Sequence, residues 1–225
     1  MIQQLTFDLP PEPRLSRADF CVSPANALAF AAVDRWQDWP NRKMLLVGPK
    51  GAGKSHLAQI WATDVGAVLV RTASLAAIDI TSLAACPAVV IEDAETLAND
   101  PASEAALFHL HNLMAQSGTL LITALTPPRD WGLTLPDLAS RMQATALTRL
   151  DPPDDALLSA VLAKLFADRQ LAISPNLIPY LVVRMDRSIA AARSIVAALD
   201  ARALSQHRPI SRAMAAEILQ SEVPR

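Results

Sequence analysis

A glycine-rich segment near the start of the chain has the residue types and the spacing of a phosphate-binding loop (P-loop). Residues 48–55, GPKGAGKS, fit the pattern G-x-x-x-x-G-K-[ST] at every position. The glycines let successive backbone N–H groups turn toward an anion, and the N-terminus of the following helix adds positive potential. Lys54 can reach the β- and γ-phosphates of a nucleotide, and the Ser55 hydroxyl can ligate Mg²⁺. The residues expected to surround the phosphates are Pro49, Lys50, Gly51, Ala52, Gly53, Lys54 and Ser55.

The segments on either side of this P-loop have the pattern that a phosphate site requires. Met44–Val47 has the pattern of a short buried strand that enters the loop, and Leu57–Ala62 that of an apolar-faced helix that leaves it. A chance glycine-rich turn would not be expected to lie between such neighbours. The context therefore predicts nucleotide binding and leaves the purpose of the nucleotide open.

Two carboxylates follow each other at the end of a later apolar run. Residues 89–93, VVIED, place Glu92 and Asp93 at the carboxyl end of a buried strand, the edge at which the sites of α/β proteins open. Glu92 together with Ser55 can hold Mg²⁺ through water, and Asp93 can orient an attacking water. The alternative is an acidic strand end that only faces solvent, and the presence of the P-loop argues against it.

The composition excludes several classes of protein. The chain has 225 residues, 52% of them hydrophobic, so it can bury the cores of one medium and one small domain. A net charge of −2 gives no basic excess of the kind that favours nucleic acids. The two cysteines and four histidines lack metal-ligand spacing, and we expect reduced thiols. Since there is no long apolar run and no leader pattern, we expect a cytoplasmic protein without membrane contacts.

From about Ala18 to Leu150, short apolar strands alternate with helical patterns. Besides the strand before the P-loop, a helix is expected at 104–116. Further strands are expected at 67–71, 88–92, 119–123 and 145–149. This alternation predicts an α/β domain, residues 15–150, with a five-stranded parallel sheet between helices.

The segment 151–155, DPPDD, ends this alternation, because prolines stop a strand and an aspartate can cap a helix. Residues 151–225 show only helical periodicity and are expected to form a small all-helical domain. Ser174-Pro175 marks the expected start of its second helix. Residues 1–14 lack any periodicity and are expected to be an extended tail. The expected helices are 154–168, 174–184, 187–206 and 211–221.

Several segments, in order along the chain, resemble those of AAA+ ATPases of the DnaA-related branch. Residues 19–26 resemble the stretch that precedes the first strand in this family, which implies that Phe20, Val22 and Asn26 surround an adenine. The P-loop followed by His56 has the form found there, which adds His56 to the expected nucleotide ligands. The resemblance extends to the end of the chain. It implies a P-loop AAA+ base with a helical lid that binds ATP or ADP with Mg²⁺.

Two segments resemble the sensor motifs of this family. The strand and turn at 119–128 resemble sensor 1, which implies that Thr123 is the sensor residue, although threonine is also an ordinary strand former. Arg187, at the start of a lid helix, resembles sensor 2. Arg184 and Arg193 lie about one turn away and are alternatives for the same contact, or are simply solvated.

Residues 138–142 resemble the box VII segment of the family, which carries an arginine finger. The resemblance implies that Arg141 acts in trans, on the nucleotide of a neighbouring AAA+ protein. A guanidinium suits this role because it is permanently charged and stabilises charge spread over the γ-phosphoryl oxygens. A lone arginine would ordinarily be a surface residue, and the position within the motif is what favours the finger.

The acidic strand end departs from the family pattern. Glu92 stands where the family has Asp, and Asp93 has the place usually taken by a water-orienting Glu. The side chain of Asp93 is shorter by one C–C bond, roughly 1.5 Å. Because geometry decides the efficiency of a general base, we expect nucleotide binding with weak intrinsic hydrolysis.

The first residues contain a second motif. Gln4–Leu9, QLTFDL, resembles the hexapeptide Q-L-x-[LF]-x-[LF] by which bacterial proteins bind the DNA polymerase III sliding clamp. An extended segment of this kind inserts spaced apolar anchors into preformed pockets, with the glutamine bonding at the rim. The alternative is a tail packed on its own domain. The expected clamp-binding residues are Gln4, Leu5, Phe7 and Leu9.

These features together resemble regulatory AAA+ proteins of the Hda type. DnaA continues past its lid into a DNA-binding domain, whereas residues 151–225 carry nine Lys or Arg against eight Asp or Glu and then end. We therefore expect no direct DNA binding. The resemblance implies regulatory inactivation of DnaA, in which the chain binds the clamp and stimulates the hydrolysis of DnaA-bound ATP. The chain itself would be a nucleotide-bound switch.

Two other functions remain open from the sequence. An autonomous ATPase, such as a DnaC-like loader, would need appreciable basal hydrolysis and a basic surface, which the neutral charge does not favour. A small P-loop kinase would leave the tail, Arg141 and the helical lid unexplained. The sequence does not decide whether ADP or ATP is resident, or whether the protein forms a homodimer.

Overall fold

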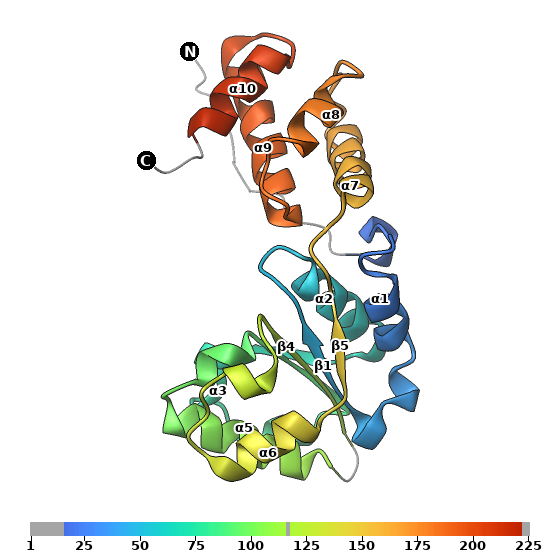
Figure 1. The fold of residues 1–225 in the computed structure, drawn as a ribbon. Helices are drawn as coiled ribbons and strands as arrows, with labels where there is room; N and C mark the ends of the chain where they lie inside the picture. Colours follow the sequence, from blue (N-terminus) through green and yellow to red (C-terminus); the bar gives the residue numbers. More distant parts are fainter. Residues whose placement is uncertain (1–15, 116–117, 222–225) are drawn as a thin grey trace, which may run out of the picture.

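Figure 1 shows the fold in a computed structural model, which describes residues 16–115 and 118–221. An α/β part lies below a group of helices, and the segment after the last strand leads from one to the other. The predicted tail, residues 1–14, lies outside the described residues, as do its four expected clamp-binding residues. Within the described part, no helix has both the length and the apolar character that crossing a membrane requires.

Five parallel strands form one sheet in the order β2-β3-β4-β1-β5. The strands are β1 (Lys43–Val47), β2 (Val68–Arg71), β3 (Ala88–Glu92), β4 (Thr119–Ala124) and β5 (Leu147–Arg149). The five predicted strands are confirmed, and their boundaries differ from the prediction by at most two residues. Because all the strands run the same way, their carboxyl ends share one edge of the sheet. At that edge β4 lies between β1 and β3.

Helices cover both faces of the sheet, as the continuously apolar strands predict. One face, which includes Leu46 and Val90, packs against α1 (Ala27–Asp34) and α2 (Lys54–Val65). The opposite face, which includes Leu45 and Ile91, packs against four helices. These are α3 (Thr72–Leu75), α4 (Ile80–Ala84), α5 (Pro101–Leu113) and α6 (Pro136–Ala144). Short 3₁₀ turns are η1 (Arg17–Asp19), η2 (Trp36–Asp38), η3 (Pro40–Arg42), η4 (Ala94–Leu97) and η5 (Pro128–Asp130).

The lid consists of four helices around a core of their own, which includes Leu158, Phe166 and Ile195. The helices are α7 (Asp155–Asp168), α8 (Leu177–Val182), α9 (Ile189–Gln206) and α10 (Arg212–Ser221). The predicted start of α8 at Ser174 and Pro175 is wrong. The N–H of Leu177 bonds to the carbonyl of Ser174 (3.0 Å), so this segment is a turn that precedes the helix.

A buried carboxylate fixes the start of α6, the helix that carries Arg141. Glu104 of α5 is fully buried and accepts hydrogen bonds from the backbone N–H groups of Thr134 (3.0 Å) and Leu135 (2.7 Å). The Thr134 hydroxyl donates to the same carboxylate (3.1 Å). Leu135 immediately precedes α6. Glu104 therefore positions the first turn of this helix against α5.

Polar groups are also buried at the amino end of the sheet, near the end of α6. Lys43, the first residue of β1, is 3% exposed and donates through Nζ to the carbonyl of His111 (2.8 Å). The Nδ1 atom of His111 is buried and has no hydrogen-bond partner in the described part of the chain. Burial, and then the positive charges of Lys43 and Arg141, lower the pKa of His111 to about 4. Arg141 thus lies close to the amino end of β1.

Replacing Glu104 by Ala should lower the free energy of unfolding by about 2–4 kcal/mol, because the backbone N–H groups of Thr134 and Leu135 then lose their buried acceptor. Urea denaturation measures this change. The exposed Glu217, which pairs with Arg202 at the surface, supplies the control, and Glu217→Ala should cost no more than ~0.5 kcal/mol. Equal effects of the two substitutions would contradict the role given to Glu104.

His111 should make the fold sensitive to acid. The pKa is about 6.5 in the unfolded chain and about 4 in the folded one, so the unfolded state takes up the proton first. The stability that the folded protein gains from keeping His111 neutral is fully present above pH 6.5. It is lost as the pH falls toward 4. His111→Gln should reduce the stability loss between pH 7 and pH 4.5 by roughly 2 kcal/mol. The exposed His109 on the same helix is the control, and an equal change in His109→Gln would refute the assignment.

Candidate functional site

The P-loop has a backbone that only glycine accommodates well. Gly51 and Gly53 have φ angles of +77° and +105°, in the left-handed region. A Cβ atom at Gly48 would lie 2.5 Å from the carbonyl oxygen of Leu150. The loop leads directly into α2, whose first residue is Lys54. The structure thus places the predicted motif between β1 and a helix N-terminus, the context that a phosphate site requires.

Lys54 is turned into the P-loop. Its Nζ atom donates to the carbonyl oxygens of Gly48 (2.8 Å) and Pro49 (3.1 Å), and the residue is buried. Burial lowers the pKa of Lys54, and nearby acids, Glu95 before Asp93 and Glu92, oppose that shift. Phosphate oxygens would be stronger acceptors for this ammonium than neutral carbonyls. The lysine is therefore poised for an anion.

The P-loop touches the lid. The backbone N–H of Ile189, at the start of α9, donates to the carbonyl of Gly51 (2.8 Å). A Cβ at Gly51 would lie 2.5 Å from the Cβ of Ser188, whose hydroxyl caps α9 by accepting from Ala191 N–H (3.0 Å). The first turn of α9 thus lies directly against the loop that would hold the phosphates.

Residues 16–21, here called the strap, place an aromatic cluster beside the P-loop. The ring of Phe20 packs edge-on against His56 (centroids 5.2 Å apart) and stacks on Phe30 (5.4 Å). One ring nitrogen of His56 lies 3.0 Å from the carbonyl oxygen of Ser16, and burial lowers the pKa of His56. Two predicted ligands, Phe20 and His56, are therefore neighbours.

A cavity of about 720 Å³ lies between the strap, α2 and the lid. Phe20 and His56 line it from the base, and Ile189 and Arg193 line it from α9. Because a Cβ at Gly53 would lie 3.4 Å from Ile189 and 3.8 Å from Phe20, the cavity adjoins the P-loop. Its volume lies in the range of small-molecule sites.

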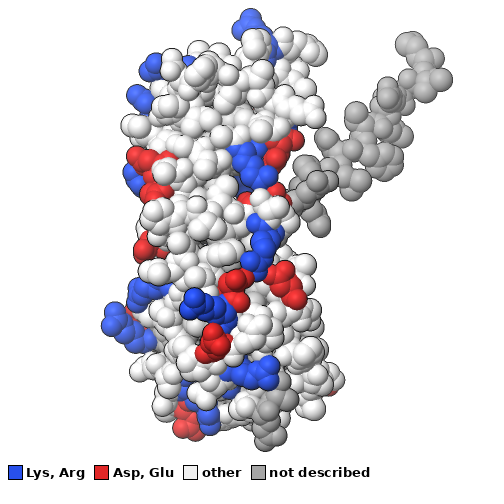
Figure 2. All heavy atoms as spheres, turned by 90° about the vertical axis from the view of Figure 1, so that its right-hand side faces the viewer, with Lys and Arg blue, Asp and Glu red and all other residues white. Residues whose placement is uncertain are grey.

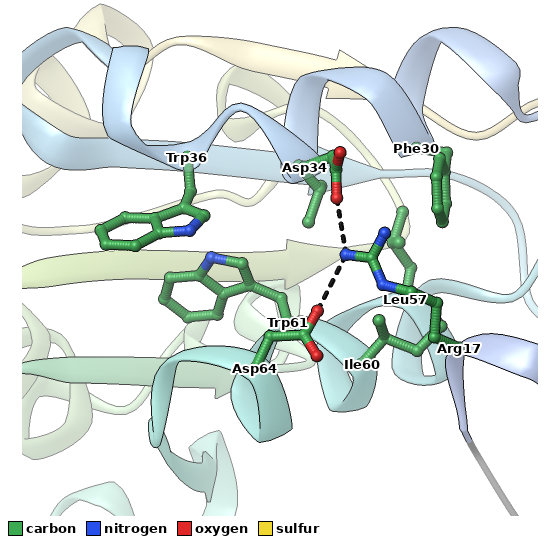
Figure 3. A pocket seen from close by; sticks show the side chains of 9 residues that line it. Arg17, Phe30, Asp34, Trp36, Leu57, Ile60, Trp61 and Asp64 are labelled. Carbon is green, nitrogen blue, oxygen red and sulfur yellow. Dashed lines mark hydrogen bonds and ion pairs between the residues drawn. The ribbon is translucent and has the colours of Figure 1, made fainter.

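The strap is bonded to both the base and the lid. Arg17 donates to Asp34 (2.5 Å) and Asp64 (2.8 Å) beside a second, small cavity of about 60 Å³ (Figure 3). Asp19 reaches the lid through an ion pair with Lys164 (2.9 Å). A hydrogen bond from the Ser16 hydroxyl and the contact with Lys164 lower the pKa of Asp19 to about 2. A movement of the lid would therefore strain or break the strap contact.

The predicted acids and Thr123 meet at the carboxyl edge of the sheet. Glu92 is buried, and its Oε1 atom has no hydrogen-bond partner among the described residues. Asp93 is exposed and has a φ of +59°, and its backbone N–H donates to the hydroxyl of Thr123 (3.4 Å). An orphan carboxylate oxygen and the exposed hydroxyl of Ser55 are groups that Mg²⁺ accepts as ligands or as partners of its bound water.

Glu95 was not predicted as a site residue. It lies in η4, directly after β3, and its Oε2 atom accepts a hydrogen bond from the backbone N–H of Leu125 (3.0 Å). Leu125 follows the last residue of β4. The sequence holds one signal, the acidic cluster EDAE at 92–95, which shows acids but not which of them faces the site.

Three predicted ligands have other surroundings. Val22 is 55% exposed. Asn26 is buried, and its amide is used by the loop before α1, where it bonds to the backbone of Ser23 (2.8 Å) and Cys21 (2.8 Å). The third is Arg187, whose contacts are described next with those of the other lid arginines.

The three lid arginines considered for the sensor 2 contact, Arg184, Arg187 and Arg193, have different surroundings. Arg187 pairs with Asp155 at the start of α7 (2.5 Å), and Arg184 lies over the ring of Tyr180 (4.2 Å). Arg193 is partly buried in the 720 Å³ cavity and has no hydrogen-bond or ion-pair partner in the described part of the chain. Burial lowers its pKa, whereas the charge of Asp19 raises it. Of the three, Arg193 is the one that lines the cavity.

Arg141 lies far from the P-loop. It is exposed near the end of α6, where its guanidinium packs over the ring of Phe108 (5.3 Å). The charge of Arg141 acts on Lys43, which begins β1, whereas the P-loop follows the other end of that strand. A strand of five residues is roughly 13–16 Å long. Arg141 and Lys54 are therefore at opposite ends of the sheet.

Charged side chains are mixed over the surface. On the face shown in Figure 2, Lys and Arg lie among Asp and Glu over the middle and lower parts, and the described residues form no continuous basic band there. The described part of the chain also holds no cluster of three or more His, Cys, Asp or Glu side chains that could bind a metal by themselves.

No model of a known protein family matches the chain, but solved structures with the same fold exist. Domain III of the replication initiation protein DnaA from Thermotoga maritima has a TM-score of 0.82 at 18% identity, over 96% of this chain and 100% of that one. AMPPCP-bound DnaA from Aquifex aeolicus has a TM-score of 0.73 at 15% identity, over 86% of this chain and 67% of that one. The Holliday junction branch migration motor RuvB from Thermotoga maritima has a TM-score of 0.63 at 17% identity, over 86% of this chain and 66% of that one.

These likenesses extend over both the sheet and the lid. At such low identities they show the fold and not the activity. The chain therefore has the α/β AAA+ fold, a P-loop base with a helical lid, in the DnaA-related arrangement.

Proposed function

We propose that this protein is a nucleotide-bound AAA+ switch that binds the sliding clamp and stimulates the hydrolysis of ATP on DnaA. Negative regulation of replication initiation would result, because ATP on the initiator is converted to ADP. The chain's own ATPase would be weak. The similarity to DnaA domain III supports an AAA+ partner of the same kind, since AAA+ surfaces of related shape can pack against each other.

The position of Arg141 carries the proposal. The side chain is exposed at the amino end of the sheet, and the chain's own P-loop is at the carboxyl end. Arg141 cannot reach a phosphate bound to Lys54 of the same molecule, but it can reach one on a neighbour. Packing over Phe108 limits the freedom of the side chain, and Glu104 fixes the helix that carries it. A preorganised guanidinium is what a trans-acting finger requires.

The surroundings of the P-loop support the proposed role as a nucleotide-dependent switch. ADP or ATP would place its phosphates at Lys54 and Ser55, and its nucleoside in the cavity beside Phe20 and His56. The solved DnaA structure with AMPPCP is a relative in fold that binds such a nucleotide. Because the P-loop contacts α9, a bound nucleotide would fix the angle between base and lid.

The residues present fit a Mg²⁺ ion bound with the nucleotide. Ser55 and Glu92 would hold it, directly or through water, as their exposed hydroxyl and orphan carboxylate oxygen allow. The ion would neutralise negative charge on the phosphates. Thr123, beside Asp93 at the same edge, would contact the phosphate end of the nucleotide.

Tethering of this protein to the clamp would make weak contacts between it and DnaA sufficient for stimulation. If Gln4–Leu9 holds the protein on a clamp loaded on DNA, every DnaA molecule nearby meets a high effective concentration of Arg141. The proposed function requires no direct contact between this protein and DNA.

Arg141→Ala should reduce the stimulation of DnaA-bound ATP hydrolysis at least ~100-fold, since arginine fingers contribute 10³ or more to the rate. The measurement is phosphate release from DnaA–ATP with clamp loaded on DNA. Arg129→Ala, an exposed arginine beside Asp130, is the matched control and should keep the stimulation. Full stimulation by the Arg141 variant, or a loss of its own nucleotide binding instead, would refute the trans role.

Replacing both Gln4 and Phe7 by Ala should weaken clamp binding at least ~30-fold, because two anchor residues are removed. Surface plasmon resonance with immobilised clamp measures this, and nucleotide affinity should stay unchanged. Thr6→Ala, at a position where the motif sets no residue type, should bind the clamp normally. Unchanged clamp binding by the double variant would remove the clamp from the proposal.

A further inference from the structure

The position of Glu95 has a geometric consequence that the neighbouring acids do not share. In the chain, Glu95 follows β3. Its carboxylate, however, accepts a hydrogen bond (3.0 Å) from the backbone N–H of Leu125, the residue after β4. The order of strands is β3-β4-β1, and the P-loop follows β1. Adjacent strands lie about 4.8 Å apart. The bond therefore moves this carboxylate one strand closer to the P-loop than the end of β3.

The same turn also holds the P-loop. The N–H of Gly48, the first residue of the loop, donates to the carbonyl of Ala124 (3.1 Å). Ala124 is the chain neighbour of Leu125, so Glu95 is bonded one residue away from the point at which the P-loop begins. Among the acids around Lys54, Glu95 has the largest effect in raising the pKa of that lysine. Geometry and charge thus both place it at the phosphate site.

The two acids predicted for catalysis are placed less favourably. Asp93 is exposed, and its backbone has the left-handed conformation at the end of β3, one strand further out. Glu92 is buried, and in the proposed function its orphan oxygen is already used for Mg²⁺. Glu95 is partly exposed, with Oε2 fixed by Leu125 and no hydrogen-bond partner for Oε1 in the described part of the chain. The Oε2 atom of Glu95 is therefore held in place, and its Oε1 atom is available to accept a hydrogen bond from a water molecule.

We propose that Glu95 is the carboxylate that orients and deprotonates the attacking water in this protein's own slow hydrolysis of bound ATP. The inference rests on the proposed nucleotide binding at Lys54. The water oxygen forms a bond to the γ-phosphorus, and the bond from that phosphorus to the β,γ-bridging oxygen breaks. The electron pair leaves with ADP, and the water proton passes to the carboxylate and then to solvent.

The test compares two isosteric substitutions, Glu95→Gln and Asp93→Asn, in the full chain. Mg²⁺-dependent binding of a fluorescent ATP analogue is titrated first. Hydrolysis is then followed under single turnover, with protein in excess over γ-³²P-labelled ATP. Glu95→Gln should bind ATP within ~3-fold of the unaltered protein and hydrolyse it at least ~100-fold more slowly, the range expected for a lost general base. The loss in Asp93→Asn should be at least ten times smaller than that, and Glu95→Asp should restore part of the rate.

Three results would overturn the assignment. They are an equal or larger loss in Asp93→Asn, a loss of ATP binding beyond ~10-fold in Glu95→Gln, and no single-turnover hydrolysis by the unaltered protein. The stimulation of DnaA is measured on the same preparations. If Glu95→Gln still stimulates DnaA, the trans function stands apart from Glu95. If the unaltered protein does not stimulate DnaA, the proposed function fails while the single-turnover comparison still decides the role of Glu95.

Discussion

The hydrogen bond from the backbone of Ile189 to the carbonyl of Gly51 (2.8 Å) joins base and lid at the P-loop. The approach leaves no space for a side chain, since a Cβ at Gly51 would lie 2.5 Å from the Cβ of Ser188. A movement of the loop must therefore move the first turn of α9 or break this bond. The ion pair between Asp19 and Lys164 is a second connection between the two parts. The lid angle and the state of the phosphate site are coupled by these contacts.

The two ends of the parallel sheet have different surroundings. At the carboxyl end, a P-loop, a buried acid and a large cavity converge on one region, as sites in α/β proteins do. At the amino end, Lys43 and His111 are buried, and Arg141 extends to the surface. In the proposed function, the carboxyl end of the sheet would hold a nucleotide and the amino end would act on a neighbouring AAA+ protein.

Local patterns in the sequence predict the strands, the lid helices and the P-loop, because apolar periodicity and glycine spacing act on the nearby backbone. They do not predict contacts made across the fold. The carboxylate of Glu95 is held beside the start of the P-loop by a bond to Leu125, thirty residues later. Arg187 pairs with Asp155, thirty-two residues earlier, and Arg193 lines the cavity instead. Placing these side chains requires the order of the strands and the packing of the lid.

Separate labelling of the two nucleotides tests the central claim, that the hydrolysis which matters takes place on the partner. DnaA is loaded with γ-³²P-labelled ATP and this protein with unlabelled nucleotide, and the labels are then exchanged, each time with clamp on DNA. We predict rapid release of labelled phosphate when DnaA carries the label, and slow release when this protein carries it. Rapid release only from this protein's nucleotide would contradict the account and favour an autonomous ATPase.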